Sequence, residues 1–504
     1  MNVIAKSETP QMAKKASCGK QKSNLKYILA TIAITVLLLL TPAPDGLQPY
    51  SWHFFAIFVG VIVGLIFEPL PGAVIGLTGL VIIALGSQWL LFSPEQLADP
   101  GFNLAGQSFK WAVSGFGNST VWLIFGAFMF AAGYDKTQFG RRLALILVKY
   151  LGRRSLTLGY AITFADLLLA PFTPSNTARS GGTIYPIIAN LPPLYGSKPN
   201  DPSSRKIGSY LMWVAITAAC ITSSMFLSAL APNLLALALV KSTVGINISW
   251  GTWFIAFLPL GILLILAMPL LAYWLYPPEV KFNDEVPRWA SQELEKLGKL
   301  SRNEILLLVF VCCALVMWIF AANWIEPALA ALLVISLMLW TGVLEWNDIT
   351  GNKAAWNTFV WFGTLVALAD GLSATGFIGW LGKEGGILLG GISPGTATVV
   401  LLVAFYLLHY LFASTTAHTT ALLPAMLTIA STIPGMNMQV FCLLMVTSLG
   451  IMGIITPYGT GPSPIYYGSG YLPAADYWRL GTIFGAIFLV ALLVIGYPWM
   501  LMMF

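Results

Sequence analysis

The sequence predicts an all-α polytopic membrane protein with an inverted-topology repeat and two re-entrant helical hairpins. Hydrophobic residues make up 57% of its 504 residues and charged residues only 9%, whereas an average soluble domain carries about 25% charged residues. Two short motifs also recur at one fixed offset along the chain. So little charge cannot cover a water-soluble fold of this size, which excludes soluble enzymes, nucleic-acid binders and disulfide-stapled secreted domains.

The chain begins with a polar tail, residues 1–26, that holds six lysines and a single acid, Glu8. These lysines account for the net charge of +6, so the charge gives no reason to expect nucleic acid as a partner. The apolar stretch 27–40 follows without a small-x-small cleavage site after it, which favours a retained first helix over a signal peptide. By the positive-inside rule we expect the tail to be cytoplasmic.

Each half of the chain then contains several apolar stretches of membrane-spanning length. Residues 136–154 hold six Lys and Arg and are predicted to be cytoplasmic. The longest hydrophilic stretch, 277–304, is predicted to be a cytoplasmic linker between a first half, 27–276, and a second half, 305–504. The apolar stretches lie near 50–68, 72–92, 119–134, 209–240, 252–276, 303–322, 326–344, 355–382, 437–457 and 477–503.

Two further segments, 155–192 and 393–434, are apolar overall but are interrupted by prolines and by clusters of Ser and Thr. These interruptions favour re-entrant helical hairpins over unbroken crossings. Non-helical backbone at membrane depth is tolerated only where it lines a cavity or is buried in protein. We therefore expect the tip of each hairpin to face a cavity or other parts of the protein.

An internal repeat relates the two halves. The motif Asn-Ser-Thr-Val-Trp at 118–122 returns as Asn-Thr-Phe-Val-Trp at 357–361, an offset of 239 residues (357 − 118). The motif Ser-Asn-Thr-Ala-Arg at 175–179 returns as Ser-Thr-Thr-Ala-His at 414–418, again with an offset of 239 residues (414 − 175). Two motifs with the same offset are hard to attribute to chance.

The orientation of the two copies follows from their charge. The loop 136–154 holds six Lys and Arg, whereas the matching window 375–393 holds only Lys383. By the positive-inside rule the two copies face opposite sides of the membrane. Inverted repeats with broken helices are typical of secondary transporters, which bind substrate near the midplane between the copies. Channels and membrane enzymes can also be built from repeats.

The tip of each hairpin carries a cluster of polar side chains between apolar arms. Hydroxyls, an amide and backbone N–H groups at these tips could coordinate a carboxylate, with partial positive charge from half-helix N-termini. Alternatively, Ser and Thr bond back to helical carbonyls or pack small helix interfaces, but two clusters in matched positions favour a binding site. The predicted ligands at the tips are Ser175, Asn176, Thr177, Ser414, Thr415 and Thr416.

Arg179 and His418 occupy equivalent positions, each four residues after the first Ser of its motif. An Arg within a span costs roughly 2.5–3.5 kcal/mol on the insertion scale, so it normally faces a cavity or a partner. A snorkelling Arg at a helix end is the alternative. We predict that both residues supply fixed positive charge to an anionic substrate, whereas His53 and His409 have no comparable support and are interpreted as structural.

Two later spans are also interrupted. Ala-Pro-Asn at 231–233 breaks the stretch 209–240, and Thr-Pro-Tyr-Gly-Thr-Gly-Pro-Ser at 456–463 breaks the helix that begins near residue 437. Unwound backbone at these points would offer carbonyls and amides to a substrate. A Pro kink whose freed groups are satisfied by neighbouring helices is the alternative. Asn233 and Thr460 are the predicted substrate ligands at the two breaks.

These motifs resemble the divalent anion:sodium symporter family over roughly residues 28–503. The segments Ser-Asn-Thr-Ala-Arg-Ser-Gly-Gly-Thr at 175–183 and Gly-Thr-Gly-Pro-Ser-Pro-Ile-Tyr-Tyr-Gly-Ser-Gly at 459–470 are similar to its bacterial citrate/succinate, tartrate/succinate and plastid 2-oxoglutarate/malate branch. The resemblance implies a scaffold domain that mediates homodimers and a mobile transport domain that carries both hairpins. It also implies elevator-type alternating access, with di- or tricarboxylates bound between the two hairpin tips.

The chain departs from the sodium-coupled members of that family near their sodium sites. It has Thr415 where they have Asn, and Thr-Ser-Ser-Met-Phe at 222–226 where they have a glycine-rich turn. Their Thr-Pro-Pro-Asn segments are altered to Leu-Ala-Pro-Asn at 230–233 and Thr-Gly-Pro-Ser at 460–463. We therefore predict a site with neither a metal ion nor a cofactor.

The sequence thus favours a sodium-independent exchanger of citrate, tartrate, malate, succinate or 2-oxoglutarate, with a sodium-coupled dicarboxylate symporter as the alternative. A fixed cation keeps its charge in the empty site, so crossing without an anion is expected to be slow, which predicts obligate exchange. An intramembrane hydrolase would need Ser414 or Ser175 with His418, but no Asp stands at a comparable spacing to orient that imidazole. An ion channel would need a ring of charges or a filter-like glycine run, and the sequence shows neither.

The same reasoning predicts the oligomeric state of the protein, its partners and the membrane in which it lies. We expect a non-enzymatic, multi-pass homodimer in a lipid bilayer, with small organic carboxylates as its other partners. A bacterial inner membrane is favoured over a plastid envelope, with the N-terminus in the cytoplasm.

Overall fold

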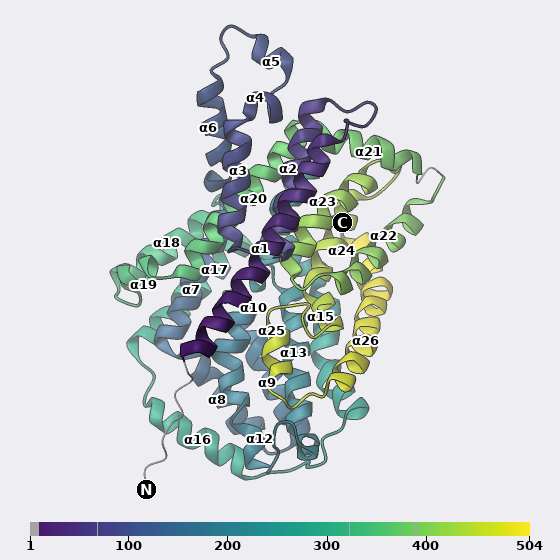
Figure 1. The fold of residues 1–504 in the computed structure, drawn as a ribbon. Coiled ribbons are helices and arrows are strands. Elements are labelled where there is room, and N and C mark those ends of the chain that lie inside the picture. The colour runs from purple at the N-terminus through teal and green to yellow at the C-terminus, as the bar shows by residue number, and fades with distance from the viewer. Residues whose placement is uncertain (1–9, 68, 322, 389–390) are drawn as a thin grey trace. The chain divides into compact units, whose positions relative to one another are not determined.

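The computed structural model describes residues 10–67, 69–321, 323–388 and 391–504, and within these ranges all side chains except those of 10–24 and 385–388. Helices joined by short connections make up this described part (Figure 1), together with one isolated antiparallel bridge between Arg154 and Phe282. Eight of the described helices, or up to ten if each bent pair counts as one span, are long and apolar enough to cross a membrane. The predicted all-helical polytopic fold is confirmed.

The chain divides into two compact units. The first, unit 1, contains the N-terminal residues up to Gly115 together with Val360–Trp380. The second, unit 2, contains Phe116–Phe359 and Leu381–Phe504. Both predicted hairpins and both predicted helix breaks belong to unit 2, which therefore contains every residue of the predicted binding site.

Unit 1 packs its first three helices closely around glycines. Its helices are α1 (Pro10–Leu40), α2 (Pro49–Phe67), α3 (Gly72–Leu85), α4 (Ser87–Leu90), α5 (Pro94–Ala98), α6 (Leu104–Ser114) and most of α20 (Lys353–Ala374). A Cβ added at Gly60 of α2 would lie 2.1 Å from Thr35 Oγ1 of α1, and one at Gly79 of α3 would lie 2.2 Å from Val61. Small residues permit such close approach of membrane helices. Helix α1 begins within the predicted basic tail, whose residues 1–9 lie outside the described residues.

The first half of unit 2 contains the first predicted hairpin. Its elements are α7 (Ser119–Thr137), α8 (Phe139–Leu151), α9 (Ser155–Leu169), η2 (Ala170–Phe172), α10 (Asn176–Ala178), η3 (Arg179–Ile184), α11 (Tyr185–Ile188), α12 (Leu191–Leu194), η4 (Pro202–Lys206), α13 (Gly208–Met225), η5 (Leu227–Ala229), α14 (Ala231–Val244) and α15 (Trp250–Leu275). Pro171 and Pro174 lack an N–H donor, which favours the end of the helical arm here. The chain then doubles back, because η3 packs against α9. Residues 155–192 are called hairpin 1 below.

The second half of unit 2 repeats the hairpin and the broken helix of the first half. It contains α17 (Arg302–Phe320), α18 (Pro327–Trp340), α19 (Trp346–Thr350), α21 (Phe377–Leu388), α22 (Pro394–Leu408), η6 (His409–Leu411), α23 (Thr415–Ser431), α24 (Met438–Ile451), η7 (Met452–Ile455), α25 (Pro462–Gly468), α26 (Ala474–Ala491), η8 (Leu492–Gly496) and α27 (Tyr497–Met503). Helix α23 packs back against α22, so residues 393–434 form a second hairpin, called hairpin 2. Its first helix begins 239 residues after that of hairpin 1 (394 − 155).

The two broken helices lie side by side in unit 2. Helix α13 resumes as α14 after η5, and α24 resumes as α25 after η7. Where α13 and α24 pack together, a Cβ at Gly450 would lie 2.4 Å from the backbone nitrogen of Ser224, so only glycine fits. The Ser224 hydroxyl also accepts a hydrogen bond from the Ile451 backbone N–H at 2.9 Å. The breaks are therefore tied to each other at the point where both helices end.

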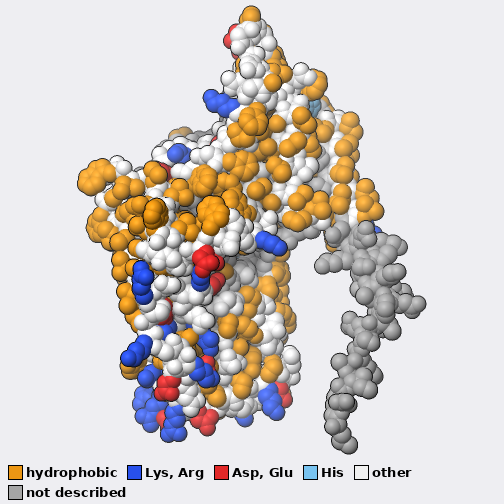
Figure 2. Space-filling model, turned by 90° about the vertical axis from the view of Figure 1, so that its left-hand side faces the viewer, with side chains coloured by type: hydrophobic (Ala, Val, Ile, Leu, Met, Phe, Trp, Pro, Cys, Tyr) orange, Lys and Arg blue, Asp and Glu red, His pale blue; other side chains and the backbone are white. Residues whose placement is uncertain are grey.

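The predicted linker forms the amphipathic helix α16 (Glu285–Leu297). It packs on α8, where Arg141 Nη2 lies 2.8 Å from Glu293 Oε2. Arg142 Nε binds Glu304 Oε1 at 2.6 Å, just after the linker helix. Charged side chains gather at this end of unit 2, where α8, α12 and α16 lie (Figures 1 and 2). The cytoplasmic location of the linker and of 136–154 remains a prediction.

Candidate substrate site

The tip of hairpin 1 is built by the N-terminal cap of α10. The Ser175 hydroxyl accepts a hydrogen bond from the Ala178 backbone N–H at 3.2 Å, which is the usual role of a Ser at this position. Asn176 is buried, and its Nδ2 donates to Thr460 Oγ1 at 2.9 Å. Thr177 is exposed, and within the described residues its hydroxyl makes no hydrogen bond. Ser175 thus shapes the turn and Asn176 binds the second break. The Thr177 hydroxyl is free to contact a ligand.

The three equivalent residues at the tip of hairpin 2 have the same three roles. The Ser414 hydroxyl caps α23 and accepts from the Ala417 backbone N–H at 3.4 Å. Thr415 is buried, and its Oγ1 donates to the Gly459 carbonyl at 3.0 Å. Thr416 is half-buried, and its hydroxyl has no hydrogen-bond partner in the described part of the chain. The third position of each tip therefore carries a free hydroxyl.

The short loop 459–461 contacts both hairpin tips. Gly459 accepts from hairpin 2, and Thr460 accepts from hairpin 1. Gly461 packs against Thr177, because a Cβ there would lie 1.7 Å from the Thr177 hydroxyl oxygen. His409 Nε2 also lies 2.8 Å from the Gly459 carbonyl oxygen, so this histidine joins the cluster although the sequence indicated only a structural role. The structure thus brings the predicted ligands of both tips to one loop.

The first break is braced by Asn233, the other predicted ligand. Its Nδ2 donates to the backbone carbonyls of Ser223 at 2.7 Å and Phe226 at 3.3 Å. Its Oδ1 is buried without a partner among the described residues. Helix α14, which carries Asn233, packs along α23 of hairpin 2, while α25 packs against η3 of hairpin 1. Each hairpin is therefore packed against the broken helix of the other half.

Arg179 differs from the prediction of an unpaired positive charge. Its side chain is only 1% exposed, and Nε lies 3.0 Å from Asp166 Oδ1. A guanidinium has five N–H donors, and all five have an acceptor here. The remaining acceptors are the carbonyls of Thr173 and Ala229, each at 3.1 Å, and the hydroxyls of Thr222 at 3.1 Å and Ser223 at 3.4 Å. The prediction is corrected because a buried cation is stable only when paired, and Asp166 supplies the opposite charge.

Asp166 was missed by sequence reasoning. It is buried on α9, and its second carboxylate oxygen accepts a hydrogen bond from Thr222. The sequence could have indicated this partner of Arg179, because Asp166 is the only acidic residue in 155–192. In a hairpin that turns near residue 173, positions 166 and 179 are almost equally far from the turn and therefore face each other. The ion pair joins the two arms of hairpin 1, and Arg179 extends the connection to the first break.

His418 lies in an aromatic environment instead of a polar one. Its ring centroid is 4.3 Å from that of Phe405, 5.0 Å from that of His409 and 5.1 Å from that of Phe412. Neither of its ring nitrogens has a hydrogen-bond partner among the described residues. Phe405 stands at the position equivalent to Asp166 (405 − 166 is again 239). No acid of the described chain contacts His418, so nothing there stabilises the predicted imidazolium.

The geometry also bears on two alternatives, an intramembrane hydrolase and a metal-ion site. Ser414 and His418 do not form the nucleophile–base hydrogen bond of a hydrolase, because the imidazole nitrogens have no described partner. Among the described residues no group of three or more His, Cys, Asp and Glu is placed to hold a metal ion.

A membrane protein whose helical hairpins end against two broken helices has the architecture of a secondary transporter. The sodium:sulfate symporter transmembrane region family matches residues 21–504, so the chain belongs to that transporter family, the divalent anion:sodium symporters. It is 56% identical over 472 residues to the L-tartrate/succinate antiporters of Shigella sonnei strain Ss046, Escherichia coli O157:H7 and Escherichia coli K12. These alignments cover 94% of this chain and 97% of each relative. The expectation of a multi-pass membrane transporter, not an enzyme, is confirmed.

Solved structures support the fold at much lower identity. The chain is similar to the Alcanivorax borkumensis YdaH transporter with a TM-score of 0.57 and 13% identity, covering 90% of this chain and 98% of that one. It is similar to Neisseria gonorrhoeae MtrF with a TM-score of 0.53 and 13% identity, covering 85% of this chain and 94% of that one. These likenesses concern the fold alone.

Proposed function

We propose that this protein exchanges L-tartrate for succinate across a bacterial inner membrane without a sodium requirement. The observation that carries this proposal is the 56% identity to L-tartrate/succinate antiporters over 94% of the chain. The site supports it, because two hairpin tips and one loop bring hydroxyl and amide groups together inside unit 2. Hydroxyl and amide groups can donate hydrogen bonds both to the carboxylates of tartrate and to its hydroxyl oxygens.

In this proposal the free hydroxyls of Thr177 and Thr416 bind the two carboxylates of the substrate. Ser175, Asn176, Ser414, Thr415 and Thr460 hold the tips in place through the bonds described above. The N-terminus of α23, capped by Ser414, adds partial positive charge toward an anion. Asn233 contributes from the first break through its unpartnered Oδ1, which would accept a hydrogen bond from a substrate hydroxyl.

The structure removes the unpaired positive charge of Arg179 from which obligate exchange was predicted. The Asp166–Arg179 pair has no net charge, so an empty site would not move an unpaired guanidinium across the membrane. Arg179 therefore acts as a positioning residue that ties the tip of hairpin 1 to the first break. The proposal of exchange rests on the relatives, and sodium independence rests on Thr415 and the segment 222–226, which replace the family's Asn and glycine-rich turn.

Further parts of the proposal concern organisation. We infer that the copies have opposite membrane orientation, with the N-terminus and 136–154 in the cytoplasm. The hairpins would move with a transport domain by an elevator mechanism in a homodimer. Single-Cys labelling at Gln138 and Gly376, in a protein without its native cysteines, tests the orientation. Opposite accessibility from the two sides is expected, and labelling of both from one side would contradict the inverted repeat.

Counterflow in proteoliposomes tests the transport proposal. Labelled succinate should enter vesicles loaded with tartrate and should enter empty vesicles far more slowly. Replacing sodium with potassium should leave both rates unchanged. Rapid uptake into empty vesicles that scales with a sodium gradient would replace the proposal with the symporter alternative.

A further inference from the structure

Unit 2 contains a cavity of about 350 Å³ beside the linker helix α16. Its walls come from the end of α7, from α8, from the second arm of hairpin 1 and from α16, and Figure 1 shows α8 and α16 near the same end of unit 2. None of the predicted substrate ligands lines this cavity. Small-molecule sites have volumes of about 300–1,000 Å³, so the cavity has room for one small ligand.

Asp135 contributes an unpaired negative charge to the cavity. It lies near the end of α7, and its carboxylate makes no hydrogen bond or ion pair with any residue that the structure describes. The neighbouring Lys136 does not neutralise it, because that ammonium binds Glu345 at 3.0 Å and Asp348 at 2.7 Å. A ligand that enters the cavity therefore meets a carboxylate without a partner.

Arg141 contributes positive charge from α8. Its Nη2 lies 2.8 Å from Glu293 Oε2, and this bond uses one of the five N–H donors of a guanidinium. Within the described chain the remaining donors of Arg141 have no acceptor. Glu293 also binds the Lys296 ammonium at 2.5 Å, so one negative charge is shared between two cations. Arg141 thus keeps both hydrogen-bond donors and positive charge for a ligand.

The rest of the cavity wall is partly apolar. Leu145, Pro186 and Ile187 line it together with the half-buried ring of Trp289. The indole N–H of Trp289 has no acceptor among the residues that the structure describes. The hydrocarbon part of a ligand would leave water against these side chains, which favours binding.

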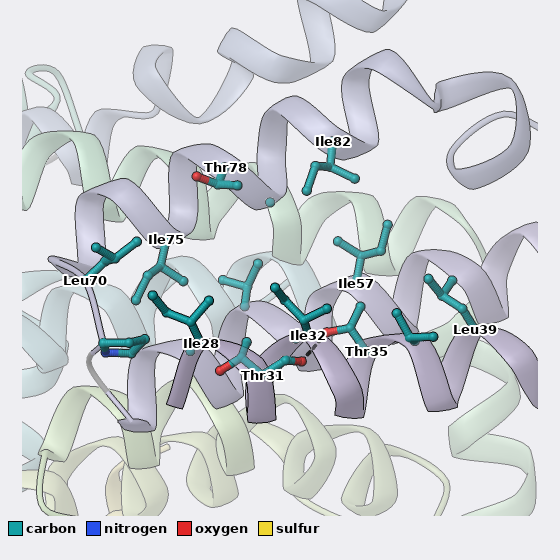
Figure 3. A pocket seen from close by; sticks show the side chains of 16 residues that line it. Ile28, Thr31, Ile32, Thr35, Leu39, Ile57, Leu70, Ile75, Thr78 and Ile82 are labelled. Carbon is teal, nitrogen blue, oxygen red and sulfur yellow. Dashed lines mark hydrogen bonds between the residues drawn. The ribbon is translucent and has the colours of Figure 1, made fainter. Parts of the chain in front are cut away.

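An apolar groove in unit 1 shows what the two charges add. It has a volume of about 370 Å³ between α1, α2 and α3, and its polar side chains are Thr31, Thr35 and Thr78 (Figure 3). Their hydroxyls donate to the carbonyls of Tyr27, Thr31 and Val74 within their own helices. The hydroxyls of the groove are therefore satisfied and select no ligand, whereas the cavity in unit 2 offers free groups of both charges.

We propose that the cavity in unit 2 binds a zwitterionic amino acid with a hydrocarbon chain, whose carboxylate lies on Arg141 and whose ammonium group lies on Asp135. A guanidinium can bind a carboxylate through two parallel hydrogen bonds. A dicarboxylate would bring a second negative charge toward Asp135, and like charges repel. A simple organic cation would leave the donors of Arg141 unused. A ligand with both charges matches both side chains, and its hydrocarbon part would pack against Trp289.

Isothermal titration calorimetry of the purified full-length protein tests the class of ligand. The probes are L-leucine and its isomer ε-aminocaproate, which differ in the separation of their two charges, and at least one of them should bind. Analogues without the ammonium group (isocaproate, caproate) or without the carboxylate (isoamylamine, amylamine) should bind about tenfold more weakly, because each loses one charge-assisted contact. If neither amino acid bound, the proposal would be overturned.

Substitutions in the cavity test the two contacts. Asp135→Asn and Arg141→Gln should each weaken binding of the amino acid about tenfold. Glu293→Gln is the matched control for Arg141→Gln, because it breaks the same ion pair but leaves the guanidinium in the cavity, so its binding should be at least as tight as that of the wild type. Glu295→Gln removes an exposed acid of α16 that does not line the cavity, and it is the control for Asp135→Asn.

The remaining outcomes separate this site from its alternatives. Equal losses in Arg141→Gln and Glu293→Gln would show that the ion pair only holds α16 in place, which would overturn the contact with Arg141. Isocaproate or isoamylamine that bound as tightly as L-leucine would replace the amino acid with a simple anion or a simple cation. Thr177→Ala should leave amino-acid binding unchanged, because Thr177 does not line the cavity. Loss of binding in that variant would place the amino acid at the hairpin tips and would overturn a separate site.

Discussion

The two hairpins are held by opposite chemistry at equivalent positions. In hairpin 1, Asp166 and Arg179 form a buried ion pair with Nε and Oδ1 3.0 Å apart. In hairpin 2 the same positions hold Phe405 and His418, whose ring centroids are 4.3 Å apart. The repeat therefore keeps the contact between the arms but replaces charge with aromatic packing. Neither hairpin presents an unpaired charge to a substrate in this structure.

The turn of each hairpin also accepts a hydrogen bond from a hydroxyl side chain of the same half. Ser228 donates to the Pro171 carbonyl, and Tyr458, 230 residues later, donates to the Tyr410 carbonyl at 3.2 Å. In both halves the segment between the broken helices binds the turn of its own hairpin. The acceptors Pro171 and Tyr410 occupy equivalent positions, because 410 − 171 is 239, whereas the donors Ser228 and Tyr458 do not. The fold therefore repeats, while the side chains that stabilise its two copies have diverged.

The largest expected effect comes from breaking the ion pair of hairpin 1. Arg179→Ala leaves Asp166 buried without its partner, which typically costs about 3–5 kcal/mol. We expect a large drop in the thermal unfolding temperature and in the yield of folded protein. Size-exclusion chromatography and thermal unfolding in detergent measure both, and an unfolding temperature equal to that of the wild type would show that the pair adds nothing to stability.

The next effect concerns the free hydroxyls at the tips. Thr177→Ala and Thr416→Ala each remove one charge-assisted hydrogen bond worth about 1.5–3 kcal/mol, so substrate binding should weaken roughly ten- to hundredfold. Thr419→Ala is the control, because its hydroxyl bonds to the Thr415 carbonyl within α23. Competition binding with unlabelled tartrate gives the affinities. Wild-type affinity in both tip variants would mean that these hydroxyls do not contact the substrate.

A smaller effect is expected at His418, which sharpens the contrast with Arg179. His418→Phe removes two unpartnered nitrogens and keeps an aromatic ring between Phe405 and Phe412. A swap of similar volume in a core usually costs less than about 1.5 kcal/mol. Folding and exchange should both survive. If folded His418→Phe protein exchanged nothing, the imidazole would have the substrate role that its sequence position predicts.

The smallest effect sets a baseline for a partly exposed ion pair of the linker helix α16. The Lys296 ammonium, hydrogen-bonded at 2.5 Å, and then Arg141 hold the pKa of the Glu293 carboxyl below its usual range. The stabilising contribution is therefore present at neutral pH and is lost as the pH falls below about 4.3, the usual Glu value, through the lower pKa of the folded state. Glu293→Gln should cost less than about 1 kcal/mol, measured by unfolding at pH 7. A loss as large as that of Arg179→Ala would remove the distinction between a fully buried pair and a partly exposed one.

Much of the fold could be predicted, because long apolar stretches in the sequence indicate membrane helices. The internal repeat could be recognised because two motifs recur at the same offset. The position of the Ser and Thr clusters at the hairpin turns could also be predicted, since such clusters between apolar arms are unusual at membrane depth. Their role in substrate binding stays a prediction. The partner of Arg179 was missed because pairing across a hairpin depends on distance from the turn, which spacing along a helix does not reveal. His409 was also missed, because its contact with Gly459 crosses from one element to another that is distant in sequence.

The central claim is that Arg179 positions hairpin 1 as half of a neutral pair and does not bind the substrate. Exchange of labelled succinate for tartrate in the double variant Asp166→Asn with Arg179→Gln tests this most directly, beside both single variants at equal amounts of folded protein. An amide pair can keep a hydrogen bond between the arms without leaving either residue charged. We predict that the double variant exchanges faster than either single variant. Folded double variant without any exchange, together with an active Asp166→Asn, would show that Arg179 binds the substrate and would contradict the account.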